Sequence, residues 1–163
     1  MRLYVMRHGI AFERGEWHGE EAARPLTEQG KARTRAVLQA LRNTKRKELK
    51  VDAIWSSPLA RALQTAEIAG KVLAAPVSTV GALACGAALP ALQTAFLKKA
   101  PLPARLMLVG HEPDCGALIA ALVGDPDGDY ALKKAGLAAL SGEFEAGGMT
   151  LRWKLAPKDV IED

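Results

Sequence analysis

Two of the three histidines in this 163-residue chain each follow directly on a short apolar run. His8 comes after an N-terminal run that ends in Arg7, and His111 comes after the run at residues 105–110. A neutral imidazole can attack phosphorus and form a phosphoenzyme, which divides one displacement into two easier steps. Guanidinium groups, such as those of Arg7 and Arg61, supply forked N–H donors that match phosphate oxygens. These residue types therefore predict a site for phosphoryl transfer.

The elements that must position these side chains are strand ends and a helix start. The two apolar runs are typical of buried strands, one at the N-terminus and one at residues 105–109. Ser57 and Pro58 follow a further strand pattern and predict a helix that has Ser57 as its cap and Pro58 at its first position. Arg61 then lies in the first turn and leans back over the strand end. Since open α/β sheets bind ligands at the carboxyl edge, we expect the four residues to meet there.

Strand and helix patterns alternate along most of the chain. Thr27 is a good N-cap for a helix that runs to about Asn43. The other predicted elements are strands at 51–55 and 76–80, helices at about 89–99 and 114–123, and a hairpin of residues 136–141 and 149–155. This order predicts an α/β fold, a three-layer sandwich with a mostly parallel central sheet, helices on both faces and the hairpin at one edge. We expect a single domain over residues 1–163.

The composition argues against several other classes of protein. No apolar run approaches the roughly 20 residues that a bilayer-spanning helix needs, so we expect no membrane segment. Arg2 and Arg7 interrupt the N-terminal run, which is therefore not typical of a signal peptide, and we expect a cytoplasmic protein. Cys85 and Cys115 lack the spacing of metal ligands, and we expect neither a disulfide framework nor a metal site.

The net charge of +4 is modest, and much of the basic excess lies at residues 42–50. We interpret this stretch as a solvated helix end and loop. Aromatic residues are too few to serve as stacking platforms for bases, so no nucleic-acid partner is expected.

Arg7-His8-Gly9 resembles the signature of the histidine phosphatase superfamily. Three further segments resemble blocks of that family in the same order: RPLTEQG at 24–30, SSPLARALQTA at 56–66 and VGHEPD at 109–114. In length and in the sequence of these motifs, the chain is most similar to the small phosphohistidine phosphatases of the SixA type. This resemblance implies that His8 is the phosphorylated nucleophile, that Arg7 and Arg61 hold the phosphoryl oxygens, and that His111 forms a hydrogen bond with the transferring group. It also implies that neither a metal nor another cofactor is needed.

Gly9 lies beside the proposed nucleophile and carries no side chain. We expect it to let the backbone approach the substrate closely. His18 lies in the polar segment at residues 10–26. We interpret it as an exposed loop residue rather than as part of the substrate rim.

One segment departs from the family pattern. Many members carry an acidic residue after the third strand, where this chain reads VGALACG at residues 80–86. An alkoxide leaving group needs a proton from a positioned acid. Imidazole differs, because its far nitrogen takes a proton near neutral pH and the ring then departs uncharged. Other carboxyl groups that loops could bring to the site are those of Glu13, Glu16, Glu20 and Glu112.

Three functions follow from these residues. The first is a phosphohistidine phosphatase, whose partner is a phosphorylated protein such as a histidine-containing phosphotransfer protein. The second is a phosphatase for small phosphate esters. The third is a non-catalytic phosphate-binding module, which the missing acid suggests but which has no need of a nucleophilic histidine.

Overall fold

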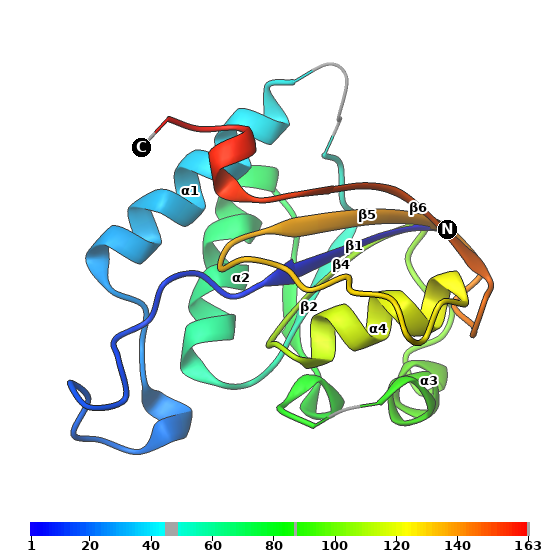
Figure 1. The fold of residues 1–163 in the computed structure, drawn as a ribbon, viewed down its shortest axis with the longest axis horizontal. Coiled ribbons are helices and arrows are strands. Elements are labelled where there is room, and N and C mark those ends of the chain that lie inside the picture. Colours follow the sequence, from blue (N-terminus) through cyan, green and yellow to red (C-terminus); the bar gives the residue numbers. More distant parts are fainter. Residues whose placement is uncertain (45–48, 87, 163) are drawn as a thin grey trace.

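The computed structural model describes residues 1–44, 49–86 and 88–162. Its strands form one six-stranded sheet in the order β3-β2-β4-β1-β5-β6 (Figure 1). The strands are β1 (Arg2–Arg7), β2 (Ala53–Ser56), β3 (Val77–Thr79), β4 (Arg105–Gly110), β5 (Leu137–Gly142) and β6 (Met149–Leu155). Strands β1 to β4 run parallel, and β5 and β6 form an antiparallel hairpin beside β1.

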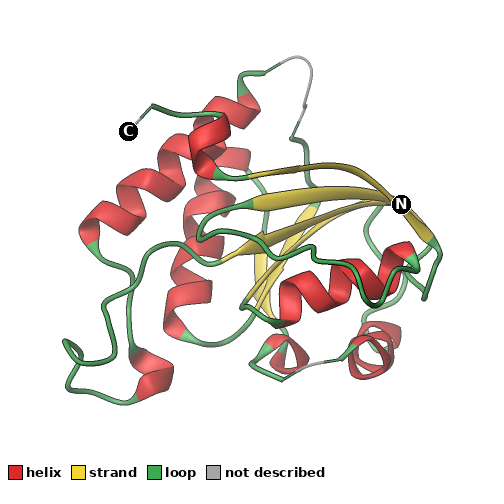
Figure 2. Ribbon diagram, in the orientation of Figure 1, coloured by secondary structure: helices red, strands yellow, loops and turns green. Residues whose placement is uncertain are grey.

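Helices cover both faces of this sheet, as Figure 2 shows. The helices are α1 (Glu28–Arg42), α2 (Ala60–Leu73), α3 (Leu89–Leu97) and α4 (Asp114–Val123). Three short 3-10 helices are η1 (Glu21–Ala23), η2 (Gly81–Leu83) and η3 (Pro157–Asp159). The predicted α/β sandwich with an edge hairpin is therefore confirmed.

Alternation along β1 divides the core into two layers. Tyr4 and Met6 pack into a cluster with residues of α1 and α2, whereas Leu3 and Val5 pack into a cluster with residues of α3 and α4. Successive side chains of a strand point to opposite faces, so a strand at the centre of the sheet is apolar on both sides. This explains why β1 appears in the sequence as a continuous apolar run.

The start of α1 agrees with its prediction. The Thr27 hydroxyl accepts a hydrogen bond from the Gly30 N–H at 2.9 Å, and the helix ends at Arg42. Between β1 and α1, the chain leaves the sheet edge as a long excursion and returns through η1 (Figure 1). A bridge between Ala11 and Leu26 closes the base of this excursion.

The predicted start of α2 is wrong by two residues. The helix begins at Ala60, not at Pro58, and the Leu59 backbone before it is extended. The Ser57 N–H donates to the Val109 carbonyl of β4 at 3.0 Å, so Ser57 continues the sheet and does not cap the helix. Arg61 still lies in the first turn, as the sequence predicts.

The basic stretch at residues 42–50 is only partly described. Residues 45–48 lie outside the described residues, so its interpretation as a solvated loop stays a prediction. Among the helices of the described ranges, none is long and apolar enough to cross a membrane.

Candidate active site

The two strand-end histidines lie next to each other. Strands β1 and β4 pair in a register that places Arg7 opposite Gly110, the last residue of each strand. The residue that follows each strand is a histidine. The ring centroids of His8 and His111 are 5.4 Å apart, with the ring planes tilted by 55°. The His8 N–H also donates to the Gly110 carbonyl at 3.0 Å. Parallel pairing thus brings together two residues that are more than a hundred positions apart in sequence.

His8 is buried, and one of its nitrogens is fixed by the backbone. Its Nδ1 lies 2.7 Å from the Gly9 carbonyl oxygen. A carbonyl only accepts, so Nδ1 carries the proton, and Nε2 of the neutral ring keeps its lone pair. Burial, together with the nearby charges of His111, Arg61 and Arg7, lowers the pKa of His8 to about 3. The ring is therefore neutral at pH 7, as a nucleophile must be.

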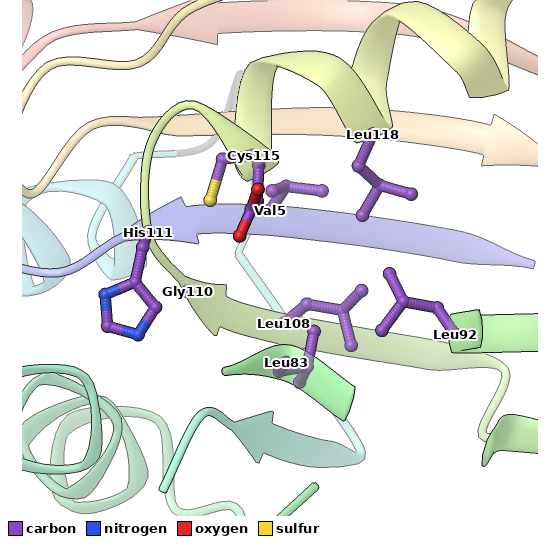
Figure 3. A pocket seen from close by; sticks show the side chains of 9 residues that line it. Val5, Leu83, Leu92, Leu108, Gly110, His111, Cys115 and Leu118 are labelled. Atoms are coloured by element: carbon purple, nitrogen blue, oxygen red, sulfur yellow. The ribbon is translucent and has the colours of Figure 1, made fainter. Parts of the chain in front are cut away.

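His111 is held by its other nitrogen. Its Nε2 lies 2.7 Å from the Ser57 hydroxyl, and that hydroxyl also accepts a hydrogen bond from the Leu59 N–H at 3.2 Å. Burial lowers the pKa of His111 to about 4, and the positive charge of Arg61 adds to this effect. Figure 3 shows the ring just past the end of β4, beyond the apolar side chains of the layer below. If Ser57 donates its proton to Nε2, the neutral ring presents an Nδ1–H donor.

The two arginines lie close enough to lower the pKa of both histidine rings. Arg61 is 4% exposed, and its Nη1 donates to the Glu21 carbonyl at 3.3 Å. Burial lowers the pKa of Arg61, and the charge of Arg24 lowers it further. Arg7 donates from Nη1 to the Leu132 carbonyl at 3.0 Å. Each guanidinium is thus anchored by one arm to a backbone oxygen.

Unpartnered polar atoms gather at this point of the molecule. Four buried side-chain nitrogen or oxygen atoms of the described residues lack a hydrogen-bond partner, and three of them are Arg7 Nε, Arg61 Nε and His111 Nδ1. A buried polar group without a partner typically costs about 1–3 kcal/mol, and such groups call for a functional explanation. Three nitrogens around a neutral histidine are suited to the oxygens of an anion.

Gly9 packs against α1. Its N–H donates to the Thr65 hydroxyl at 3.0 Å, and a Cβ atom on Gly9 would lie 2.4 Å from Thr34 Oγ1. This close approach to α1 gives a packing reason for glycine. The N–H is already used by Thr65, and a contact of Gly9 with substrate stays a prediction.

The four predicted carboxyl groups do not reach the histidines by any contact in the described structure. Glu13, Glu16 and Glu20 are exposed on the excursion before α1, as is His18. Glu112 accepts hydrogen bonds from the N–H groups of Gly116 and Leu132, at 2.8 and 2.6 Å. Its carboxylate therefore joins α4 to the segment before β5, which is a structural role.

Three charged residues that the sequence reasoning did not assign do lie at the site. The Glu21 carboxylate is 2.9 Å from Arg24 Nη2 and 3.6 Å from Arg61 Nη1, and the hydrogen bond from Arg24 lowers the pKa of Glu21. Asp114 accepts from the Gly86 N–H at 2.7 Å and raises the pKa of nearby His111 in opposition to its burial. The i,i+3 spacing of Glu21 and Arg24 was the available signal, but η1 was not predicted.

A small apolar cavity lies directly below His111. Its volume is about 20 Å³, and its walls include Val5, Leu108 and Leu118 (Figure 3). Its walls are mostly apolar, so it does not suit a charged phosphoryl group. The anion-binding groups lie above it, at the sheet edge.

The sequence model of the histidine phosphatase superfamily (branch 1) matches residues 3–84, about half of the chain. This chain belongs to that superfamily. The matched segment includes His8 and both arginines, and the resemblance noted from the sequence is confirmed. An uncharacterized protein of Picosynechococcus sp. is 40% identical over 144 residues, which cover 86% of this chain and 84% of the relative.

Solved structures of three phosphatases have a similar fold. The protein histidine phosphatase SixA complexed with tungstate is 25% identical, with a TM-score of 0.83 over 99% of this chain and 100% of that one. The alpha-ribazole phosphatase of Shigella flexneri is 18% identical, with a TM-score of 0.72 over 96% and 97%. A mycobacterial glucosyl-3-phosphoglycerate phosphatase is 21% identical, with a TM-score of 0.68 over 95% and 98%. At these identities the last two show the fold alone.

Proposed function

We propose that this superfamily member is a phosphohistidine phosphatase that works through phosphorylated His8. The observation that carries the proposal is the cluster of three unpartnered buried nitrogens around a neutral histidine. The similarity to SixA supports the same reading, because tungstate is a tetrahedral oxyanion like phosphate.

In the first step, His8 Nε2 attacks phosphorus while Arg7 and Arg61 hold the phosphoryl oxygens. The new N–P bond forms on His8, and the N–P bond to the substrate imidazole breaks. The departing ring takes a proton from water and leaves uncharged. Nδ1–H of His111 donates to a phosphoryl oxygen, where negative charge is stabilised by a preorganised donor.

In the second step, water attacks the phosphorus of phospho-His8. The P–O bond forms, the bond to Nε2 breaks and inorganic phosphate leaves, so that His8 returns to its neutral state. Two displacements with an easily departing imidazole replace one direct hydrolysis.

The carboxyl groups support an imidazole leaving group over an alkoxide. The segment from Gly81 to Gly86 contains no acid, and the Glu21 side chain at the arginines is held as a carboxylate by Arg24. A general acid must carry a proton when the leaving group departs. Glu21 in this state therefore does not favour ester hydrolysis.

A second candidate function is the hydrolysis of small phosphomonoesters. It is favoured by Asp114, whose carboxyl group lies next to both His111 and the Gly86 N–H. An alkoxide leaving group needs a proton from a positioned acid, and Asp114 is the carboxyl group at that position.

The test compares kcat/KM for a phosphohistidine-containing phosphotransfer protein with kcat/KM for a panel of sugar and nucleotide phosphates. We expect a clear preference for the phosphoprotein and a labelled enzyme after rapid alkaline quenching, since alkali preserves phosphohistidine. A preference for one ester that is lost in an Asp114→Asn variant would establish the second function. The absence of label on the enzyme would overturn the covalent mechanism.

We also propose that the reaction needs no metal ion. Turnover of the phosphoprotein after dialysis against EDTA is expected to equal that of the untreated enzyme. Recovery of lost activity by an added divalent cation would contradict this part.

A further inference from the structure

A basic groove adjoins the cluster of unpartnered nitrogens and shares Arg7 with it. It has a volume of about 420 Å³ and is formed by the end of β1, α1, the segment before β5, and η3. Five of its lining residues are basic: Arg7, Arg33, Lys133, Lys134 and Lys158. Figure 1 shows η3, the red turn near the C-terminus, close to α1. The proposed phosphoryl chemistry uses only Arg7 of this set.

The groove concentrates one sign of charge. No carboxylate is among the described residues that line it, and Lys133, Lys134 and Lys158 are exposed. The nearest acid on η3 is Asp159, which lines an adjoining recess and accepts the Ala156 N–H at 2.7 Å. Lys154 lines that recess too, so the wider surface stays basic. A cleft lined by one sign of charge attracts ligands of the opposite sign and raises their association rate.

The groove begins next to the nucleophile. The Ala135 N–H donates to the His8 carbonyl at 3.1 Å, and the Leu132 carbonyl accepts from Arg7. Lys133 and Lys134 lie between these two contacts. A phosphohistidine bound at His8 would therefore have its neighbouring residues within reach of the lysines.

We propose that this groove docks acidic side chains that flank the phosphohistidine of a protein substrate. The inference rests on the proposed function, and it says which surface of the enzyme recognises the protein substrate. Guanidiniums anchored to the backbone, such as those of Arg7 and Arg61, suit one phosphoryl group, whereas exposed lysines on flexible stems are hydrated point charges. Such charges suit carboxylates spread over a protein segment, and they act mainly on association rate and specificity.

The experiment uses two phosphohistidine peptides of equal length, one with two glutamates on each side of the phosphohistidine and one with glutamines instead. Wild-type enzyme is expected to show about tenfold higher kcat/KM for the acidic peptide at low salt, and about 0.5 M NaCl is expected to remove most of the difference. The Lys133→Glu/Lys134→Glu variant is expected to lose the preference. A salt-dependent preference distinguishes docking from a change in the fold.

The matched control reverses two lysines that do not line the groove, Lys71 in the last turn of α2 and Lys98 at the end of α3. The Lys71→Glu/Lys98→Glu variant has the same net charge and should keep the preference. Equal turnover of both peptides by wild-type enzyme would overturn the docking proposal alone. The proposal would also be overturned if the Lys133→Glu/Lys134→Glu variant, but not the control variant, lost turnover of both peptides. The lysines would then serve the reaction itself. No turnover of either peptide by wild-type enzyme would overturn the proposed function as well.

Discussion

The ends of β1 and β4 carry the same local pattern, a buried strand followed by a histidine, but the two rings are held by opposite nitrogens. His8 is fixed through Nδ1 by the Gly9 carbonyl, and His111 is fixed through Nε2 by the Ser57 hydroxyl. The ring nitrogen that has no hydrogen-bond partner therefore differs between the two histidines. His8 keeps a lone pair at Nε2, and His111 has an unpartnered Nδ1. Under the proposed function, one hydrogen bond to each ring suits His8 to the role of nucleophile and His111 to the role of donor.

The difference predicts first that His8 has no substitute. A His8→Ala variant is expected to lose more than about 10³-fold in kcat, because removing the nucleophile removes the covalent route. Steady-state turnover of the phosphoprotein measures this, with alkaline quenching to count phosphoenzyme. Label on the variant would assign the nucleophile to another residue, and the natural one to check is His111.

His111 should be less demanding. A His111→Ala variant is expected to lose about 10²-fold in kcat, as is typical when one donor to a transition-state oxyanion is removed. Asparagine can place an amide N–H near the position of Nδ1, so His111→Asn should keep more activity than His111→Ala. Single-turnover rates of the three enzymes test the order. Equal rates for the two variants would contradict a donor role at Nδ1.

Both rings should make stability depend on pH. Burial lowers the pKa of His8 to about 3 and that of His111 to about 4, from 6.5 when exposed. The unfolded chain then binds more protons than the native one below pH 6.5, so native stability is full above that pH and falls as the pH drops toward 4. At pH 5 each ring is expected to cost about 2 kcal/mol relative to pH 7.

Urea unfolding at pH 7 and pH 5 measures this loss. In a His8→Gln or His111→Gln variant, the difference between the two pH values should shrink by about 2 kcal/mol, whatever the variant's stability at pH 7. The chosen window lies above the ordinary pKa of carboxyl groups, which limits their contribution. An unchanged difference would show that the ring titrates in the folded protein as it does when exposed.

Ser57 should have the smallest effect, because it acts through His111. A Ser57→Ala variant leaves Nε2 without its partner, so the Nδ1–H tautomer is no longer favoured; we expect about a tenfold loss in kcat with little change in KM. The pH profile of kcat, compared with that of wild-type enzyme, separates this from a folding defect. A profile and kcat equal to those of the wild type would show that Ser57 does not position the ring.

Much of the site was predictable because its residues lie next to recognisable local patterns. Apolar periodicity marked the strand ends at His8 and His111, and parallel pairing brings such ends to one edge of a sheet. Arg61 followed from a helix start, even though that start was misplaced by two residues. The misplacement arose because Ser57 remains hydrogen-bonded to β4, a contact between distant segments that no local pattern reports.

The carboxyl groups were the least predictable part. Glu21 reaches Arg61 only because the excursion before α1 folds back against the start of α2, and Asp114 meets Gly86 only because the segment after η2 lies against the start of α4. Glu112, next in sequence to His111, instead binds backbone N–H groups of α4 and of the segment before β5. Proximity in sequence to a strand end therefore did not predict proximity to the site.

The sequence by itself determined the α/β sandwich, the family and the meeting of two histidines and two arginines at one edge. These depend on strand periodicity and on residues adjacent to strand ends, which are local properties of the chain. The tertiary structure decided which nitrogen of His111 stays available, because Ser57 follows β2 and His111 follows β4, and it decided which carboxylate faces the arginines. It also decided that lysines from two segments join Arg33 of α1 in one groove. Hydrogen bonds and charges between distant segments depend on distances of a few ångströms, which only the folded chain sets.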